Sequence, residues 1–105
     1  MDFPDILKQH SVVISALRGH SSTGAPLYAP DTTIACLVEE ARRRVLDGAG
    51  EAVTAEARIF APLATVAPAG SLALLPSGRQ ATVIRTNRLD GGDLPVPSHV
   101  EIYTT

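Results

Sequence analysis

The side chains that most often carry chemistry are sparse in this chain of 105 residues, which holds three histidines and one cysteine. His10, His20 and His99 do not lie at a ligand spacing from one another, whereas a zinc site needs three or four convergent ligands. Cys36 could act as a thiol nucleophile with a distant histidine, but apolar residues flank it on both sides, so we expect a small buried hydrophobe. We therefore expect no catalytic residues, no metal site and no cofactor, and we do not expect an enzyme.

Two stretches combine glycine with polar residues, at positions 21–24 and 90–93. Neither matches a phosphate-binding loop, because no Lys-Ser or Lys-Thr step follows and no strand-to-helix context surrounds them. Asp90 and Asp93 could bind calcium weakly, or they could simply keep a loop solvated.

The densest charge cluster is Glu39 and Glu40 followed by Arg42, Arg43 and Arg44. On a helix these residues would form pairs four positions apart, and on a strand hairpin they would spread to both sides of an exposed ribbon. Three consecutive arginines could meet phosphates or the acidic surface of a partner. The alternative is a solvated face whose charges compensate one another.

Composition limits the fold to one domain with a thin core. Apolar residues make up 45% of the chain, but aromatic residues only 4%, and tryptophan is absent. Alanine, valine, leucine and isoleucine must then fill the core, and contacts between subunits are a common remedy for such a core. The formal charge of −2 is not that of a protein that grips nucleic acid. We expect no disulfide, no signal peptide and no membrane span.

The first third of the chain predicts a short helix, a strand and a loop. Residues 3–9 could form one or two helical turns, with Asp2 as the N-cap. Residues 11–17 are β-branched and predict a buried strand, whereas glycine and proline punctuate residues 18–30, which we interpret as a loop.

Residues 31–50 are ambiguous. Residues 32–38 resemble a strand, yet the apolar positions from 34 to 45 also fall at helical spacing, which slightly favours a helix over residues 37–46. The Asp47-Gly48 step that follows is a favoured hairpin turn, and residues 53–60 alternate as a strand does. A hairpin at this turn would require a strand over residues 37–46 instead.

The rest of the chain predicts short strands joined by tight turns. Residues 71–75 and 80–85 form an expected hairpin, residues 87–97 a loop, and residues 99–103 a closing strand with Val100 and Ile102 facing inward. About six strands with regular turns are typical of a small β-barrel or sandwich.

About two-thirds of the chain resembles a known family. The resemblance rests on residues 35–60, an Ala-Pro step, a turn near residues 68–71, Leu-Leu-Pro-Ser-Gly-Arg at 74–79, Ala-Thr-Val-Ile at 81–84, Asp-Gly-Gly at 90–92 and Leu-Pro-Val-Pro-Ser-His-Val-Glu at 94–101. This pattern resembles the head-to-tail stopper (head closure) proteins of long-tailed bacteriophages, especially those that infect actinobacteria.

The resemblance implies a mainly β protein, with a small barrel of about six strands and a hairpin that protrudes over residues 33–60. It implies a virion structural protein, made in the host bacterial cytoplasm and located in the neck. There it would form a ring with twelvefold or sixfold symmetry below the portal or adaptor, close the DNA-filled head, let double-stranded DNA pass without sequence specificity, and dock a tail terminator or tail-completion protein. The hairpin tip at residues 39–51 would face the channel.

The resemblance thus nominates two groups of residues. The candidates for the channel or the subunit interface are Glu39, Glu40, Arg42, Arg43, Arg44, Asp47 and Glu51. The candidates for docking loops are Arg18, His20, Tyr28, Arg88, Asp90 and Asp93.

A small OB-like or SH3-like module that binds nucleic acid or a protein ligand is the alternative. Such a module should expose aromatic side chains on a sheet face for stacking. The chain has few of them and they are scattered: Phe3, Tyr28, Phe60 and Tyr103.

Overall fold

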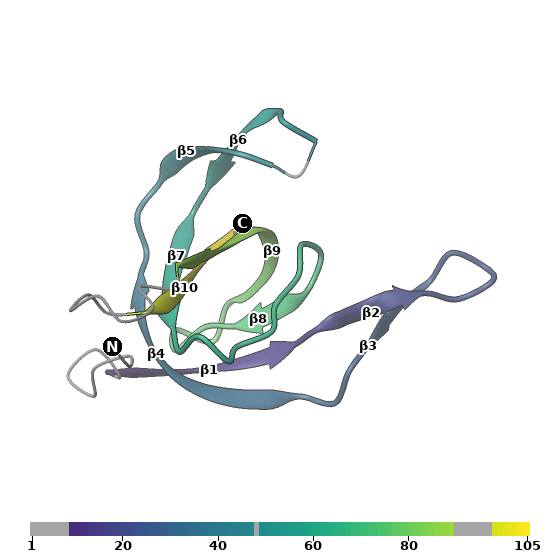
Figure 1. Cartoon of the computed structure of the whole chain (residues 1–105), viewed down its shortest axis with the longest axis horizontal. Helices are drawn as coiled ribbons and strands as arrows, with labels where there is room; N and C mark the ends of the chain where they lie inside the picture. The colour runs from purple at the N-terminus through teal and green to yellow at the C-terminus, as the bar shows by residue number, and fades with distance from the viewer. Residues whose placement is uncertain (1–8, 48, 90–97) are drawn as a thin grey trace.

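Six antiparallel strands close into one barrel in the computed structural model, which describes residues 9–47, 49–89 and 98–105 (Figure 1). Around the barrel the order is β1-β4-β7-β10-β9-β8. Their bounds are β1 His10–Ser15, β4 Thr32–Glu39, β7 Ala57–Ala61, β8 Leu72–Leu74, β9 Gln80–Leu89 and β10 His99–Thr104. The expectation of a mainly β chain with a six-stranded barrel is therefore confirmed.

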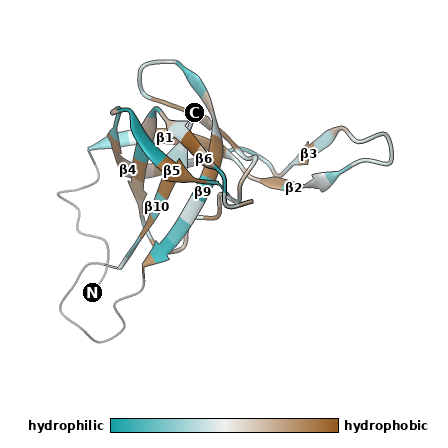
Figure 2. Cartoon of the chain, turned by 90° about the horizontal axis from the view of Figure 1, so that it is seen from above, coloured by the Kyte–Doolittle hydropathy of each residue, from teal (hydrophilic) through white to brown (hydrophobic). Residues whose placement is uncertain are grey.

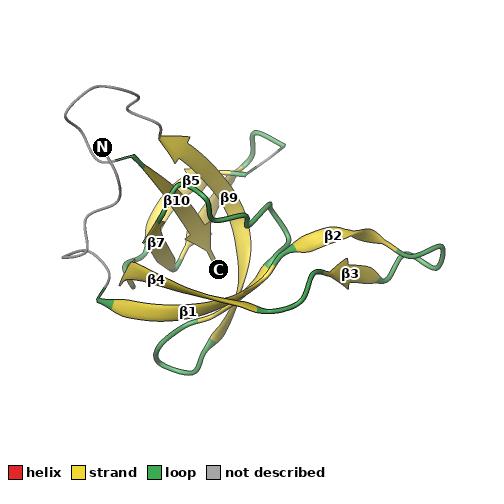
Figure 3. Cartoon of the chain, turned by 60° about the horizontal axis from the view of Figure 1, so that its bottom comes forward, coloured by secondary structure: helices red, strands yellow, loops and turns green. Residues whose placement is uncertain are grey.

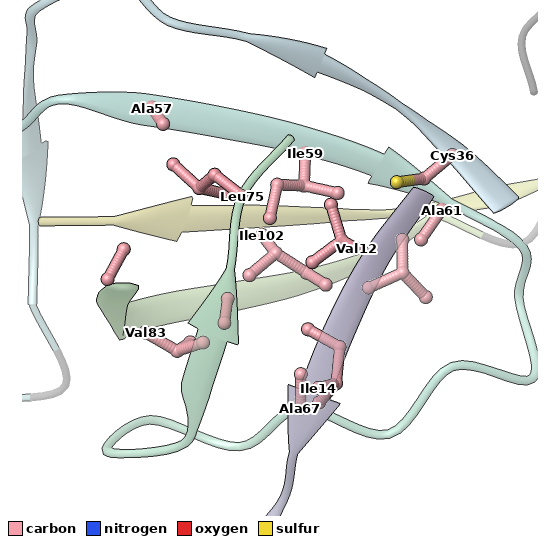
Figure 4. Packing of buried hydrophobic residues seen from close by; sticks show 13 residues of the cluster. Val12, Ile14, Cys36, Ala57, Ile59, Ala61, Ala67, Leu75, Val83 and Ile102 are labelled. Carbon is pink, nitrogen blue, oxygen red and sulfur yellow. The ribbon is translucent and has the colours of Figure 1, made fainter. Parts of the chain in front are cut away.

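Strand alternation builds the core. In β7 and β10 every second side chain is buried, so that Ile59 and Ile102 face each other across the register while the residues between them face outward. Figure 4 shows Val12, Ile59 and Ile102 pointing toward one another inside the barrel. The prediction that Val100 and Ile102 face inward is confirmed.

The core is made of small aliphatic residues, as the composition predicted. Its thirteen members are Val12, Ile14, Cys36, Ala57, Ile59, Ala61, Ala67, Ala73, Leu75, Ala81, Val83, Val100 and Ile102. The narrow interior of a small barrel leaves little room for aromatic rings, and five of these residues are alanines.

Two additional two-stranded ribbons leave the barrel. One consists of β2 (Leu17–His20) and β3 (Pro26–Tyr28), and the other of β5 (Arg43–Leu46) and β6 (Ala52–Ala55). The β2–β3 ribbon extends along the long axis of the molecule, clear of the barrel (Figures 1 and 2). Because β4 lies between β3 and β5 in the chain, the two ribbons are joined to its opposite ends.

Residues 37–46 form no helix, so the helical periodicity was misleading and a hairpin is present. It protrudes only as the β5–β6 ribbon and not over all of residues 33–60, because the two ends of that range lie in β4 and β7 of the barrel. Leu37 to Glu39 pair with β7, and β5 pairs with β6 in a register that places Val45 opposite Val53. Every regular element in the described part of the chain is a strand (Figure 3). The expected N-terminal helix over residues 3–9 lies, except for Gln9, outside the described residues.

The interpretation of residues 18–30 as a loop was wrong, because they contain most of the β2–β3 ribbon. Pro26 is the first residue of β3, a position where its missing N–H costs little in a two-stranded ribbon. The register shifts between Leu17 and Gly19, so Arg18 occupies a bulge. The glycine and proline residues that predicted a loop are instead accommodated at the edge and at the bulge of this ribbon.

The expected hairpin over residues 71–85 is confirmed as β8 and β9, with Leu72 opposite Thr82. β9 is longer than expected and continues through Asn87 to Leu89, which pairs with His99. The loop expected over residues 87–97 therefore begins no earlier than residue 90, and residues 90–97 lie outside the description.

A candidate assembly surface

The bend between β4 and β5 carries most of the predicted interface residues, and they form ion pairs within the chain. We call this network the charged elbow; its members are Glu39, Glu40, Arg42, Arg43, Glu56, Arg58 and Arg79. It gathers one end of β4, the start of β5, the bend between β6 and β7, and the β8–β9 turn. The cations and anions of this part of the chain thus compensate one another largely within one subunit.

Glu39 is the centre of the charged elbow. Its Oε1 accepts a hydrogen bond from Arg43 Nη2 at 2.7 Å, and its Oε2 accepts one from Arg58 Nη2 at 3.0 Å. The hydrogen bond from Arg58, together with the positive charges of both arginines, lowers the pKa of the Glu39 carboxyl from its ordinary value. The guanidinium of Arg58 also lies over the ring of Phe60, with its Cζ 4.6 Å from the ring centroid.

Two more exposed pairs complete the charged elbow. Arg42 Nε lies 3.2 Å from Glu56 Oε1, and Arg79 Nη2 lies 3.4 Å from Glu40 Oε1. Exposed pairs of this kind contribute at most about 1 kcal/mol each to folding. Their main consequence is electrostatic, because they leave little net charge where the sequence places three consecutive arginines.

Only part of this network was predicted from the sequence. The pairing of Glu39 with Arg43 was expected for a helix, and it forms here across a bend between two strands. Glu40 pairs with Arg79 instead of Arg44. Sequence reasoning missed Glu56 and Arg58, whose only signal was the outward face of the alternating strand, and Arg79, which lies in the turn between β8 and β9.

The β5–β6 ribbon has one covered face and one exposed face. Val45, Val53 and Ala55 lie on the covered face and are half-buried or buried. The opposite face, which we call the outer ribbon face, is exposed and consists of Arg44 opposite Thr54 and Leu46 opposite Ala52. Arg44 makes no ion pair or hydrogen bond with the described residues.

The tip of this ribbon is held by Asp47. Its carboxylate accepts hydrogen bonds at 2.9 Å from the backbone N–H groups of Ala49 and Glu51. Asp47 is thus a turn-stabilising residue, and the side chain of Glu51 is the exposed carboxylate at this tip.

The predicted docking residues are more widely separated than the residues of the charged elbow. Arg18 and His20 are exposed on β2, and Tyr28 is half-buried on β3, so all three belong to the β2–β3 ribbon. Arg88 is exposed near the end of β9. Asp90 and Asp93 lie outside the described residues.

The base of the β2–β3 ribbon is fixed to the barrel by two residues that the sequence did not single out. Ser71 is completely buried, and its Oγ accepts a hydrogen bond from the Leu17 backbone N–H at 2.8 Å. Gly70 has a φ of 92°, and a Cβ at this position would lie 2.8 Å from Leu17 Cδ2. The glycine permits both the backbone turn and the close approach of Leu17.

An apolar groove of about 480 Å³ lies beside this base. Its walls come from the end of β1, the start of β4, the segment between β3 and β4, and the loop after β7. Ile34, Ala35, Pro30 and Pro62 line it, and Val66 is 69% exposed at its edge. The signal for this groove in the sequence is weak: an apolar stretch between two prolines at positions 62 and 68.

Cys36 is buried in the core, as expected, and burial raises the pKa of its thiol to about 11. His10 accepts a hydrogen bond at its Nδ1 from the Val38 N–H, and His99 lies beside Glu101. No group of three or more potential metal-ligating side chains occurs among the residues that the structure describes. Within the same residues, no helix is long and apolar enough to span a membrane.

Comparison of the chain with protein-family models gives no match, and comparison with curated proteins gives none either.

Proposed function

We propose that this chain is the head-to-tail stopper of a long-tailed bacteriophage, and that it acts as a ring-forming structural subunit without enzymatic activity. In this role a ring of copies lies below the portal or adaptor, closes the filled head and receives the tail. The observation that carries the proposal is the β5–β6 ribbon, an arm outside the barrel at the segment that in the resembling family reaches the channel.

The charge distribution supports passage of DNA without capture. Binding to DNA depends on cations that neutralise phosphates and release counterions. Here four arginines are held by three carboxylates of the same chain: Arg43 and Arg58 share Glu39, Arg42 pairs with Glu56, and Arg79 pairs with Glu40. A channel wall built from such pairs gives moving DNA few unpaired cations to bind.

Two features of the fold support an assembly role: two ribbons extend from the barrel, and the core consists of small side chains. Both ribbons present backbone edges and side chains that the barrel itself does not use. Contacts with neighbouring subunits would bury additional apolar surface, which the alanine-rich core buries only in small amounts.

Binding of single-stranded nucleic acid finds less support in the same surface. A stacking platform needs an aromatic ring that is open on one face of the sheet. Phe60 has Arg58 over its ring and lies 5.8 Å from the ring of His99, centroid to centroid. This aromatic side chain is thus already engaged.

Electron microscopy of particles produced from the genome that encodes this chain tests the proposal. Antibody fragments against the chain should label the neck between head and tail, and particles made without the chain should be heads that lose DNA, beside unattached tails. Label elsewhere on the particle, or complete virions without the chain, would reject the role. Tight, salt-sensitive binding of single-stranded DNA by the purified chain would favour the binding module instead.

A further inference from the structure

The chain carries an exposed apolar groove at one place and an exposed apolar arm at another. The groove lies beside the β2–β3 ribbon and uses Thr32 and Ile34, at the start of β4. The outer ribbon face belongs to β5 and β6, and β5 follows the opposite end of β4. Leu46 is 51% exposed on this arm, and Val66 is 69% exposed at the groove, so each surface leaves a large apolar side chain in water.

We propose that the outer ribbon face of one copy seats in the apolar groove of a second copy, with Leu46 in the groove and Arg44 beside Asp31 at its rim. This inference rests on the proposed ring and names the contact that would build it.

The chemistry of the two surfaces is complementary. The groove is lined almost entirely by carbon, from Ala16, Ala29, Ile34 and Pro62 among others. Leu46 and Ala52 face each other across the ribbon and offer a narrow apolar ridge. A ridge that is two strands wide and flanked by small residues is complementary in shape to a groove whose walls are alanine and proline.

The charges match as well. Asp31 is exposed and lies in the chain between Pro30 and Thr32, which both line the groove. Within the described residues its carboxylate accepts a hydrogen bond only from Ser15, a neutral donor, so its charge is not neutralised. Arg44 lies two residues before Leu46 on the same face of β5 and pairs with no carboxylate of its own described chain. Arg44, which has no ion-pair partner among the described residues, thus accompanies the apolar ridge.

The contact has to join two copies because a ribbon cannot reach the groove of its own subunit. The ribbon is anchored at the charged elbow through Arg43, and the Leu46 carbonyl accepts a hydrogen bond from Arg85 of β9 at 3.5 Å. These contacts hold the ribbon beyond the Glu39 end of β4 (Figure 1). The groove is lined by residues toward the Thr32 end of the same strand. Two different surfaces then meet, which produces a head-to-tail contact that closes into a ring when the rotation permits.

Disulfide trapping between separately prepared variants tests this contact. Leu46→Cys and Val66→Cys are mixed and oxidised, and we expect a mixed dimer that neither variant forms alone. Both positions are exposed, so folding should not change. Leu46→Cys mixed with Leu74→Cys is the matched control, because Leu74 is 44% exposed and does not line the groove. Wild-type protein controls for Cys36.

A charge exchange tests the polar part. Asp31→Arg or Arg44→Asp alone should weaken self-association in sedimentation equilibrium by about tenfold, and the two together should restore it. Three results would each overturn the contact. The mixed dimers could be no more abundant than in the Leu74 control, the only dimers formed could join two Val66→Cys chains, or the charge exchange could fail to restore self-association. Neck labelling that fails while trapping succeeds would reject the viral role and leave the contact standing.

Discussion

Replacing Ser71 by alanine tests how the β2–β3 ribbon is fixed to the barrel. The Ser71 Oγ is the acceptor for the Leu17 N–H, and Ser71 is completely buried. Alanine removes the acceptor and leaves the N–H at the root of the ribbon without a partner, at a cost of about 1–3 kcal/mol. For a domain of this size the melting temperature should fall by roughly 5–15 °C.

Thermal unfolding followed by circular dichroism measures the loss, and amide hydrogen exchange locates it. The Leu17 amide should exchange faster in the variant, while amides of β7 and β10 should keep their order of protection. Ser77→Ala is the control, because Ser77 is exposed in the β8–β9 turn and should change the melting temperature little. A Ser71→Ala protein as stable as the wild type, with unchanged exchange at Leu17, would refute the reasoning.

The remaining predictions concern a glycine, a carboxylate and the thiol. Gly70→Ala should destabilise the fold more than Gly78→Ala in urea unfolding, because both have φ near +90° but only the Cβ at Gly70 meets Leu17; equal losses would mean that the contact costs nothing. The folded-state pKa of Glu39 is lowered, so the contribution of Glu39 to the free energy of unfolding is present above the ordinary value near 4.5 and is lost as pH falls through the folded-state pKa. Glu39→Gln should therefore flatten the dependence of stability on pH in that acidic window. An unchanged slope would contradict the pairing. Cys36 should react with a thiol reagent in the native protein far more slowly than in denaturant, and equal rates would show that it is accessible.

Where local alternation and tertiary pairing agree, the sequence was sufficient. Residues 99–103 alternate, lie in the barrel wall and were predicted with the correct inward face. The Asp47-Gly48 step located a hairpin because the turn is encoded by its own residues, and Asp47 indeed holds that turn.

Where pairing depends on distant strands, the sequence was insufficient. Residues 87–89 have no alternating pattern and are in a strand because β10 lies beside them. The alternating stretch 53–60 was predicted as one strand, but it bends at Glu56, whose N–H donates to the Thr104 carbonyl, and passes from the ribbon into the barrel. Glycine and proline in residues 18–30 predicted a break in structure, although they fit the bulge and the free edge of a ribbon.

The candidate site was predicted in its charged part and missed in its apolar part. Glu39 to Arg44 stand out in sequence because charges are dense there, but their partners come from β7 and the β8–β9 turn, which only the closed barrel brings close. The groove combines four separate segments, so no single stretch of sequence carries its signal.

One strand connects both arms, and this has a mechanical consequence. β4 pairs with β1 over its first five residues and with β7 over its last three, and it spans roughly 23 Å at the usual rise of an extended strand. Because every residue of β4 pairs with β1 or with β7, a force that reaches this strand from either arm acts on the barrel wall and not on a free segment. In the proposed ring, β4 would therefore couple the contacts that one subunit makes with its two neighbours.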